Sequence, residues 1–340
     1  MRQDRNDEVD RLDQLEPYMG LVPSVVFQGQ RVRVLFNTLH VRPQAETFHE
    51  FLRNVVLWTL GQEWWKHQSK LPEARMHVVV RWKYSLARLT QQRPNKVLVE
   101  DNREVFAVDA PRPIWALIML GYDLFCLQAK NALPSFLVDR LTRNRDFQAA
   151  RYEVAVAAVM TRAGFETRFL DEGAKKEKHC EFIARHRESG IEMGVEAKSR
   201  VRSGVLHEPG DFSYSQDWEG VFNLIRKAKK QKPPGLPFIL FVDLNLPPSP
   251  RIAPNKKPWM TDLAGALKNL EKSLKGANWP FNAIFPTNFG LHFDLPGETG
   301  LRTEWGYYVP SRPDTPLHDK KVIKAVMDVL ARYTRIPTEV

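Results

Sequence analysis

The sequence has few of the features that define several common protein classes. Two of its 340 residues are cysteines, Cys126 and Cys180, which are too few for a disulfide framework or a four-thiolate zinc site. The longest nearly continuous apolar stretch, 114–127, contains Asp123 and is shorter than the ~20 residues that span a bilayer. The first sixteen residues hold many charges and lack the apolar core of a secretory signal. We therefore expect a soluble, cytoplasmic protein without a membrane partner.

Motifs of familiar enzyme classes are also missing. The chain has no G-x-x-x-x-G-K-[ST] phosphate loop, no G-x-G-x-x-G dinucleotide turn, no H-E-x-x-H zinc helix and no G-x-S-x-G nucleophile elbow. Its nine histidines show no metal-ligand spacing, and it has no internal repeat or low-complexity tract. The sequence thus gives no support for a nucleotide-binding fold, a zinc peptidase or a serine hydrolase.

Acidic residues are outnumbered by basic ones. Fifty Lys and Arg against forty Asp and Glu give a net charge of +10 and a pI near 9.5. This balance favours a polyanionic partner, because neutralising phosphates releases their counterions. A generally basic surface without such a partner explains the charge equally well.

Apolar periodicity and proline clusters indicate three regions. With 43% apolar residues the chain can bury one large core or two medium ones. Residues 1–145 resemble a short strand pair near 25–36 followed by helices, which predicts a mainly helical amino-terminal domain. Residues 146–250 alternate helix and strand patterns and predict an α/β core. Residues 251–340 predict a carboxy-terminal α/β extension packed on that core.

The most informative region begins with an alanine-rich helix predicted over 147–163. At about 100° per residue, Glu153 lies on the apolar side of this helix, and Arg151 and Arg162 lie on the opposite side. Burying an unpaired carboxylate is costly. Glu153 therefore either serves a cation, a donor or a site, or lies at the edge of the apolar stripe with its stem bent towards water.

Two alternating segments further along, 180–186 and 191–198, are typical of a β-hairpin. A tight turn between them places Glu181 directly opposite Glu196 on the neighbouring strand. The two-residue period of a strand puts the apolar residues on one face. The other face then carries Glu181, Glu192, Glu196 and Lys198.

Two facing carboxylates repel each other unless a cation lies between them. Mg²⁺ suits such a place, because it binds one or two carboxylates, a backbone carbonyl such as that of Ala197, and several waters. Lys198 would then orient or deprotonate the attacking water and stabilise charge on the phosphate. The alternative is a solvated sheet face on which Lys198 pairs with a glutamate.

Taken together, these residues resemble the PD-(D/E)XK nuclease superfamily over about 146–246, under a third of the chain. Glu196 and Lys198 match the E-x-K element, Glu181 matches the acidic residue of the preceding strand, and Glu153 matches the helix glutamate of many members. The resemblance implies a restriction-endonuclease-like α/β fold, in which helices flank a mixed sheet. It also implies nucleic-acid cleavage with Mg²⁺, or with Mn²⁺, in restriction, repair, recombination or phage defence.

One departure from the superfamily pattern concerns its first motif, because Cys180-Glu181 stands in place of the usual Pro-Asp. Glutamate can bind the metal, but its extra methylene moves the carboxylate away from the strand. Some members of the superfamily have lost catalysis. The alternative function is therefore a catalytically silent nuclease fold that binds nucleic acid or scaffolds a complex.

A second helix, predicted to start at Asp217, ends in a run of basic residues. With the two arginines beyond Lys198, these side chains would hold a nucleic-acid backbone near the carboxylates. A solvated helix end that complements its own dipole is the alternative. DNA is favoured over RNA as the partner, and a homodimer or a protein complex stays open. The predicted nucleic-acid contacts are Arg200, Arg202, Arg226, Lys227, Lys229 and Lys230.

Overall fold

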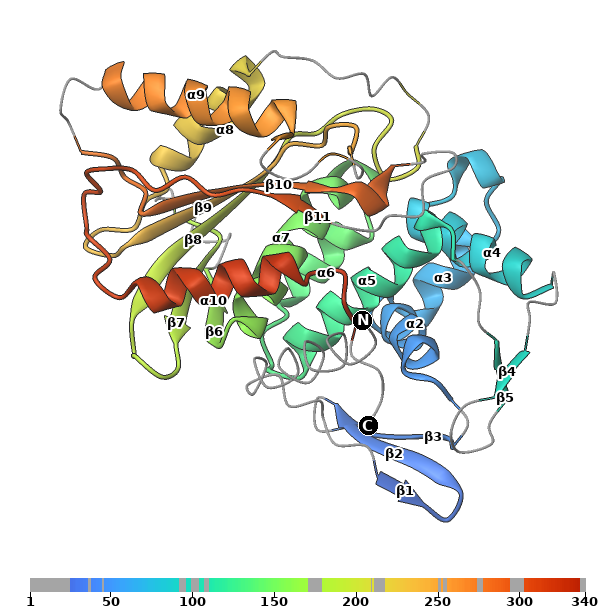
Figure 1. Cartoon of the computed structure of the whole chain (residues 1–340). Helices are drawn as coiled ribbons and strands as arrows, with labels where there is room; N and C mark the ends of the chain where they lie inside the picture. Colours follow the sequence, from blue (N-terminus) through green and yellow to red (C-terminus); the bar gives the residue numbers. More distant parts are fainter. Residues whose placement is uncertain are drawn as a thin grey trace.

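The computed structural model of the chain (Figure 1) describes most of its length. None of the helices in the part that it describes is both long and apolar enough to cross a bilayer. The described residues are 25–35, 38–44, 46–91, 96–98, 104–106, 110–170, 179–208, 210, 218–249, 252, 256–273, 278–293 and 303–336.

Within these ranges a mixed sheet of six strands, in the order β11-β10-β9-β8-β7-β6, forms the centre of the molecule. The pairs β6–β7, β7–β8 and β10–β11 are antiparallel, and the pairs β8–β9 and β9–β10 are parallel. The strands are β6 (Phe165–Phe169), β7 (Phe182–His186), β8 (Glu192–Ser199), β9 (Phe238–Asp243), β10 (Ala283–Phe289) and β11 (Thr303–Trp305). The predicted α/β class with a mixed sheet is confirmed.

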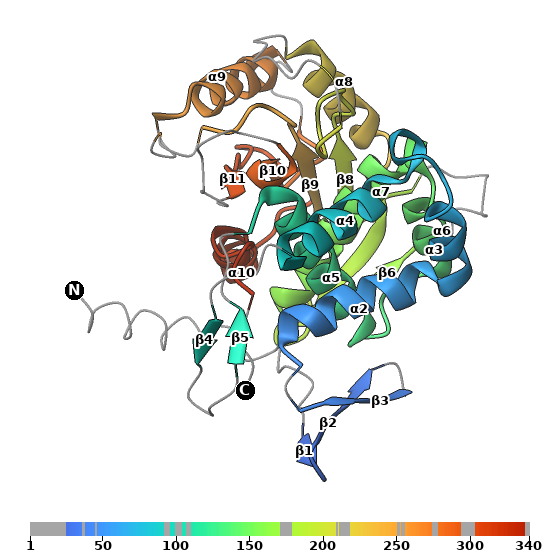
Figure 2. The same ribbon diagram turned by 90° about the vertical axis from the view of Figure 1, so that its right-hand side faces the viewer.

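Helices cover both faces of the sheet (Figures 1 and 2). One core packs the sheet against α5 (Arg112–Gln128), α7 (Asn144–Arg162) and α10 (Lys320–Ala331). A second core packs it against α8 (Glu219–Lys229) and α9 (Pro258–Ser273). Every residue of β9 is buried, as expected for a strand enclosed on both faces.

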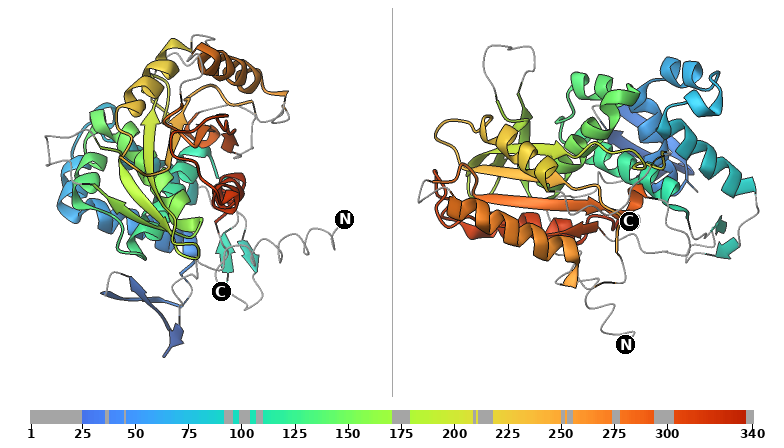
Figure 3. Two further views of the ribbon diagram at one scale, coloured as in Figure 1. Left: turned by 90° about the vertical axis from the view of Figure 1, so that its left-hand side faces the viewer. Right: turned by 90° about the horizontal axis from the view of Figure 1, so that it is seen from above.

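The amino-terminal helices lie beside α5, away from the sheet strands (Figure 3). A capping box between Thr47 and Glu50 starts α2 (Phe48–Leu60). Helices α2 and α5 approach so closely that a Cβ on Gly121 would lie 2.4 Å from the Leu52 carbonyl oxygen. The remaining elements are β1 (Val25–Phe27), β2 (Gln30–Leu35), β3 (Thr38–Pro43), α3 (Gln62–Gln68), η1 (Glu73–Arg75), α4 (Val78–Gln91), β4 (Lys96–Leu98), β5 (Glu104–Phe106), α6 (Ser135–Leu141) and η3 (Gly290–His292).

The predicted strand pair near the amino terminus is present and is extended by β3 into a three-stranded antiparallel sheet. One apolar cluster runs from Leu35 to Tyr333 and includes α2, α4, α5, α7 and the sheet. The division of the chain into three domains at residues 145 and 250 stays a prediction.

Helix α7 is enclosed on both sides, which the sequence pattern did not indicate. Arg151 and Arg162, on the side opposite Glu153, are as deeply buried as its apolar residues. Arg151 Nη1 lies 3.2 Å from Asp123 Oδ2 on α5, and Arg162 Nη1 donates to the Tyr333 carbonyl at 3.2 Å. An ion pair and a hydrogen bond with neighbouring elements thus replace solvent on that side of the helix.

Candidate active site

The hairpin of β7 and β8 has the predicted register. Phe182 pairs with Val195 and Ala184 pairs with Met193, and these side chains belong to the core under α7, as the two-residue period predicts. One step beyond the last pair, the Glu181 N–H donates to Glu196 Oε2 at 3.1 Å. The two glutamates are therefore neighbours across the strands.

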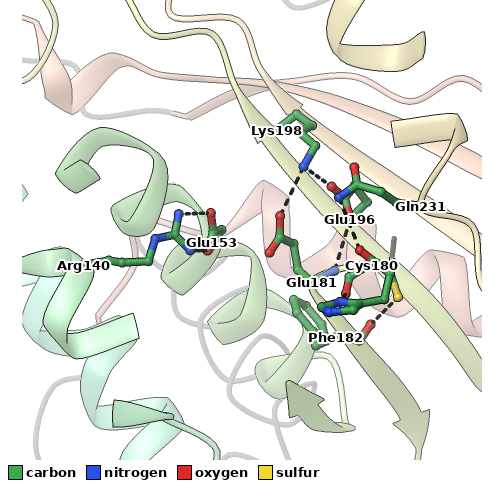
Figure 4. A network of polar contacts seen from close by, with 9 residues as sticks. Arg140, Glu153, Cys180, Glu181, Phe182, Glu196, Lys198 and Gln231 are labelled. Carbon is green, nitrogen blue, oxygen red and sulfur yellow. Dashed lines mark hydrogen bonds and ion pairs between the residues drawn. The ribbon is translucent and has the colours of Figure 1, made fainter. Parts of the chain in front are cut away.

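Lys198 joins these two carboxylates. Its Nζ lies 3.3 Å from Glu181 Oε1 and also contacts Glu196 Oε1 (Figure 4). The Glu196 side chain is fully buried, whereas those of Glu181 and Lys198 are 17% and 19% exposed. The structure thus brings these three predicted residues together at a place that solvent reaches from one side.

Glu153 comes to the same region from α7. It is buried, and Arg140 of α6 holds its carboxylate with two bonds, Nη1 to Oε2 at 2.6 Å and Nη2 to Oε1 at 2.7 Å. Figure 4 shows this pair beside Glu181 and Lys198. The sequence therefore located the carboxylate but missed its partner. Arg140 carries no signal of its own, since only the packing of α6 on α7 brings it to Glu153.

The electrostatics of the cluster follow from its burial. Burial raises the pKa of Glu196 and of Glu153, and the negative charge of Glu181 raises both further. Burial disfavours the charged form of Lys198, but Glu196 and Glu181 together outweigh it and raise the pKa of the amine. Lys198 is therefore an ammonium beside these carboxylates. It is a donor and an electrostatic stabiliser, and not a base, while they remain ionised.

Cys180, which replaces the usual proline, is a packing residue. It is fully buried in the core under α8, and its Sγ lies 3.5 Å from the Phe182 carbonyl oxygen. Burial, with a contribution from the charge of Glu196, raises the pKa of the thiol to about 12. The thiol thus stays protonated and is not a nucleophile at neutral pH.

The basic end of α8 lies close to the carboxylates. Gln231, which follows this end, donates to the His179 carbonyl at 3.3 Å (Figure 4). Arg226 bonds to Glu219 and Asn223 of its own helix. The predicted start of the helix at Asp217 lies outside the described residues. The exposed basic side chains at this end are Arg226, Lys227, Lys229 and Lys230.

Arg200 and Arg202, which follow Lys198, form hydrogen bonds within the fold. Arg202 Nη1 donates to the Asn245 carbonyl at 3.0 Å, and its N–H donates to Gln148 Oε1 at 3.2 Å. The Arg200 N–H donates to the Asp243 carbonyl and continues the pairing of β8 with β9. Both side chains are half-buried. Their predicted contact with nucleic acid stays a prediction.

The donor set at Glu181 and Glu196 fits a hard cation. The Lys198 ammonium touches both carboxylates, so the space between them accommodates positive charge. Across the described ranges, no group of three or more His, Cys, Asp or Glu side chains is arranged to hold a metal ion. With the Ala197 carbonyl, the two carboxylates suit an ion that keeps most of its waters, as Mg²⁺ does. They do not suit zinc, which needs three or four protein ligands.

No protein-family model, no curated protein and no solved structure matches the chain. A functional interpretation therefore depends on the geometry of these side chains.

Proposed function

We propose that the chain is a Mg²⁺-dependent nuclease that hydrolyses phosphodiester bonds in nucleic acid, with DNA as the favoured substrate. The observation that carries the proposal is the convergence of Glu181, Glu196 and Lys198 beside the Glu153–Arg140 pair. Three carboxylates and two cations leave one net negative charge if all are ionised. A site with this imbalance attracts a divalent cation, which in turn attracts a phosphate.

Each side chain has a role that follows from its contacts. Glu181 and Glu196 would bind the metal, which supplies Lewis-acid stabilisation of the phosphate and an acidic water. Lys198 would move off its glutamates and donate to the developing phosphate charge. The two Arg140 bonds favour the ionised form of Glu153, although burial and the charge of Glu181 outweigh them and raise the Glu153 pKa to about 8. In its ionised form, Glu153 can orient a water ligand.

The order of the elements supports a restriction-endonuclease-like fold as part of this proposal. Helix α7 is followed by the antiparallel strands β6, β7 and β8, then by α8, and then by β9, which runs parallel to β8. A helix, a three-stranded meander, a second helix and a further strand form the core of that fold. Restriction, repair or phage defence would be the biological setting.

A cleavage assay tests the function directly. The purified chain is incubated with single-stranded DNA, double-stranded DNA and RNA of one sequence, in Mg²⁺, Mn²⁺ or EDTA. We expect cleavage with either metal and none in EDTA. In the same assay Glu196→Gln should lose cleavage. Glu192→Gln is its matched control, because Glu192 lies on the same strand as Glu196 but is exposed. Cleavage in EDTA would contradict the metal-dependent chemistry.

A catalytically silent nucleic-acid-binding or scaffold module is the second candidate. The observation in its favour is that the Lys198 ammonium occupies the space between the carboxylates, next to a first motif that carries Cys180 and Glu181. The same assay separates the two functions. Binding of nucleic acid without cleavage under any metal condition would favour the module.

A further inference from the structure

A second candidate site lies at the far edge of the sheet, away from the glutamates. A cavity of about 680 Å³ opens between α9, the edge strand β11 and the segment that follows α10. This volume is within the range of about 300–1,000 Å³ that is typical of small-molecule sites. We call it the aromatic pocket, and its lining includes Trp259, Pro286, Thr303, Tyr307, Tyr308 and Arg335.

The walls of the aromatic pocket are held in place by polar contacts, of which that of Trp259 is buried and that of Tyr308 is partly exposed. Trp259 Nε1 donates to Glu304 Oε2 at 3.1 Å, and the Tyr308 hydroxyl donates to the Glu271 carboxylate. Glu304 is itself buried and is fixed by Lys257 and by Asn288 Nδ2, the latter at 3.0 Å. The rings of Trp259 and Tyr308 therefore need little ordering when a ligand binds.

Two side chains of the aromatic pocket, those of Tyr307 and Thr303, lie in surroundings that do not suit them. Tyr307 is 54% exposed, although its ring is large and mostly apolar. Thr303 Oγ1 is buried, yet it has no hydrogen-bond partner in the described part of the chain. An exposed ring and an unused hydroxyl in the lining of one pocket suit a flat ligand that stacks on the ring and offers a polar edge to the hydroxyl.

We propose that the aromatic pocket binds a nucleobase. Aromatic side chains stack on every base, whatever its sequence, and Arg335 in the lining provides a cation for the attached phosphate. The choice of ligand rests on the proposed function, because a nucleic-acid substrate brings such bases to the protein. A free mononucleotide presents the same ring and phosphate, so the test includes both sources.

The sheet register connects the aromatic pocket with Lys198. Lys198 pairs with Val242 on β9, and Val242 pairs with Pro286 on β10, which lines the aromatic pocket. At a strand spacing of about 4.8 Å, Pro286 is about 10 Å from Lys198 across the sheet. This distance corresponds to about three nucleotide steps of a helical strand. This is the shortest path and runs through the buried Val242, so a strand that passes over the surface needs more than about three nucleotides to serve both places.

The experiment uses 2-aminopurine, whose fluorescence is quenched when its ring stacks. It is supplied within a single-stranded oligonucleotide and, separately, as the free nucleoside monophosphate, both in EDTA so that nothing is cut. We expect saturable quenching with the wild type. Tyr307→Ala should weaken binding about 5- to 150-fold, since stacking is lost. Thr303→Val, which keeps the shape and removes the hydroxyl, should weaken it less.

Val309→Ala is the control, because Val309 is 56% exposed and does not line the aromatic pocket. Equal affinities for Tyr307→Ala and the wild type, or an equal loss with Val309→Ala, would overturn the proposal. Stronger quenching by the oligonucleotide supports the pocket with a strand as the source of the base, and stronger quenching by the monophosphate supports it with a free nucleotide as the source. Quenching without metal-dependent cleavage would refute the nuclease and keep the aromatic pocket. Cleavage without quenching would refute the aromatic pocket alone.

Discussion

Helix α7 takes part in two ionic clusters that differ in one instructive way. Glu153 belongs to the open cluster, whose other members are Arg140, Glu181, Glu196 and Lys198. Arg151, two residues earlier and about 200° away around the helix, points to the closed network, which consists of Arg151, Asp123 and Tyr333. Both contain buried charges with shifted pKa values. Burial of charge alone therefore does not distinguish a functional site from a structural one.

Solvent access and charge balance distinguish the two clusters. In the closed network all three side chains are at most 1% exposed, and one carboxylate meets one guanidinium and one hydroxyl. In the open cluster Glu181 and Lys198 reach solvent, and carboxylates outnumber cations. The charges of the closed network thus balance, whereas the open cluster gains from one more cation. We therefore expect substitutions in the open cluster to lower the activity of the protein, and substitutions in the closed network to lower its stability.

The largest expected effect is that of Glu196→Gln in the open cluster. The change keeps the shape of the side chain and removes one ligand charge, so we expect cleavage to fall by roughly 10³-fold or more. Calorimetry should show weaker Mg²⁺ binding, and circular dichroism an unchanged fold. If Glu196→Gln cuts as fast as Glu192→Gln, the open cluster is not the active site.

Lys198→Met should separate metal binding from chemistry. Loss of the ammonium removes charge stabilisation, and we expect cleavage to fall by about 10²- to 10³-fold. Because Lys198 contacts both glutamates, its removal should leave Mg²⁺ affinity equal or higher in a calorimetric titration. Weaker Mg²⁺ binding in this variant would mean that the amine supports the metal site rather than competing for it.

Arg151→Met should affect stability and not the chemistry. It leaves the buried Asp123 without its cation, so we expect the free energy of unfolding in urea to fall by about 3–5 kcal/mol. Arg145→Met on the same helix is the control, because the Arg145 side chain is 87% exposed. Its effect should stay within about 0.5 kcal/mol. Similar losses for both variants would remove the distinction between buried and exposed arginines on α7.

The closed network should also give stability a pH dependence. Burial raises the pKa of Asp123 to about 6, with Arg151 opposing the shift. Because the folded pKa lies above the unfolded one, the folded protein holds this proton more tightly, and stability is lost as pH rises from about 4 to about 6. Relative to Asp123→Asn, the wild type should lose up to about 3 kcal/mol over this window. A constant difference in unfolding free energy between the two proteins would contradict the shifted pKa.

The two clusters also differ in what the sequence reveals. The hairpin register followed from alternation, because a one-residue slip would have moved Phe182 and Val195 out of the core. That register was enough to bring Glu181, Glu196 and Lys198 together. Arg140 and Asp123 could not be found in this way, because they reach α7 from separate helices. Helix packing leaves no periodic signal that links such residues.

The smallest expected effect is on the binding of nucleic acid near the open cluster. The closed network needs no such partner. Lys227 and Lys230 are exposed at the end of α8, close to the open cluster through Gln231 and His179. Changing both lysines to Ala should weaken nucleic-acid binding for all sequences and lower the salt slope of log K by roughly one unit per lost phosphate contact.

The matched control for this pair is Lys320→Ala with Lys321→Ala, at the start of α10. This double variant removes the same charge from the molecule, so it separates net charge from position. If binding depends on the overall charge of +10, the two double variants will reduce the salt slope equally. If the end of α8 guides the backbone to the glutamates, only the change at Lys227 and Lys230 will do so, because counterion release counts the phosphates that are contacted and not the charge of the whole protein.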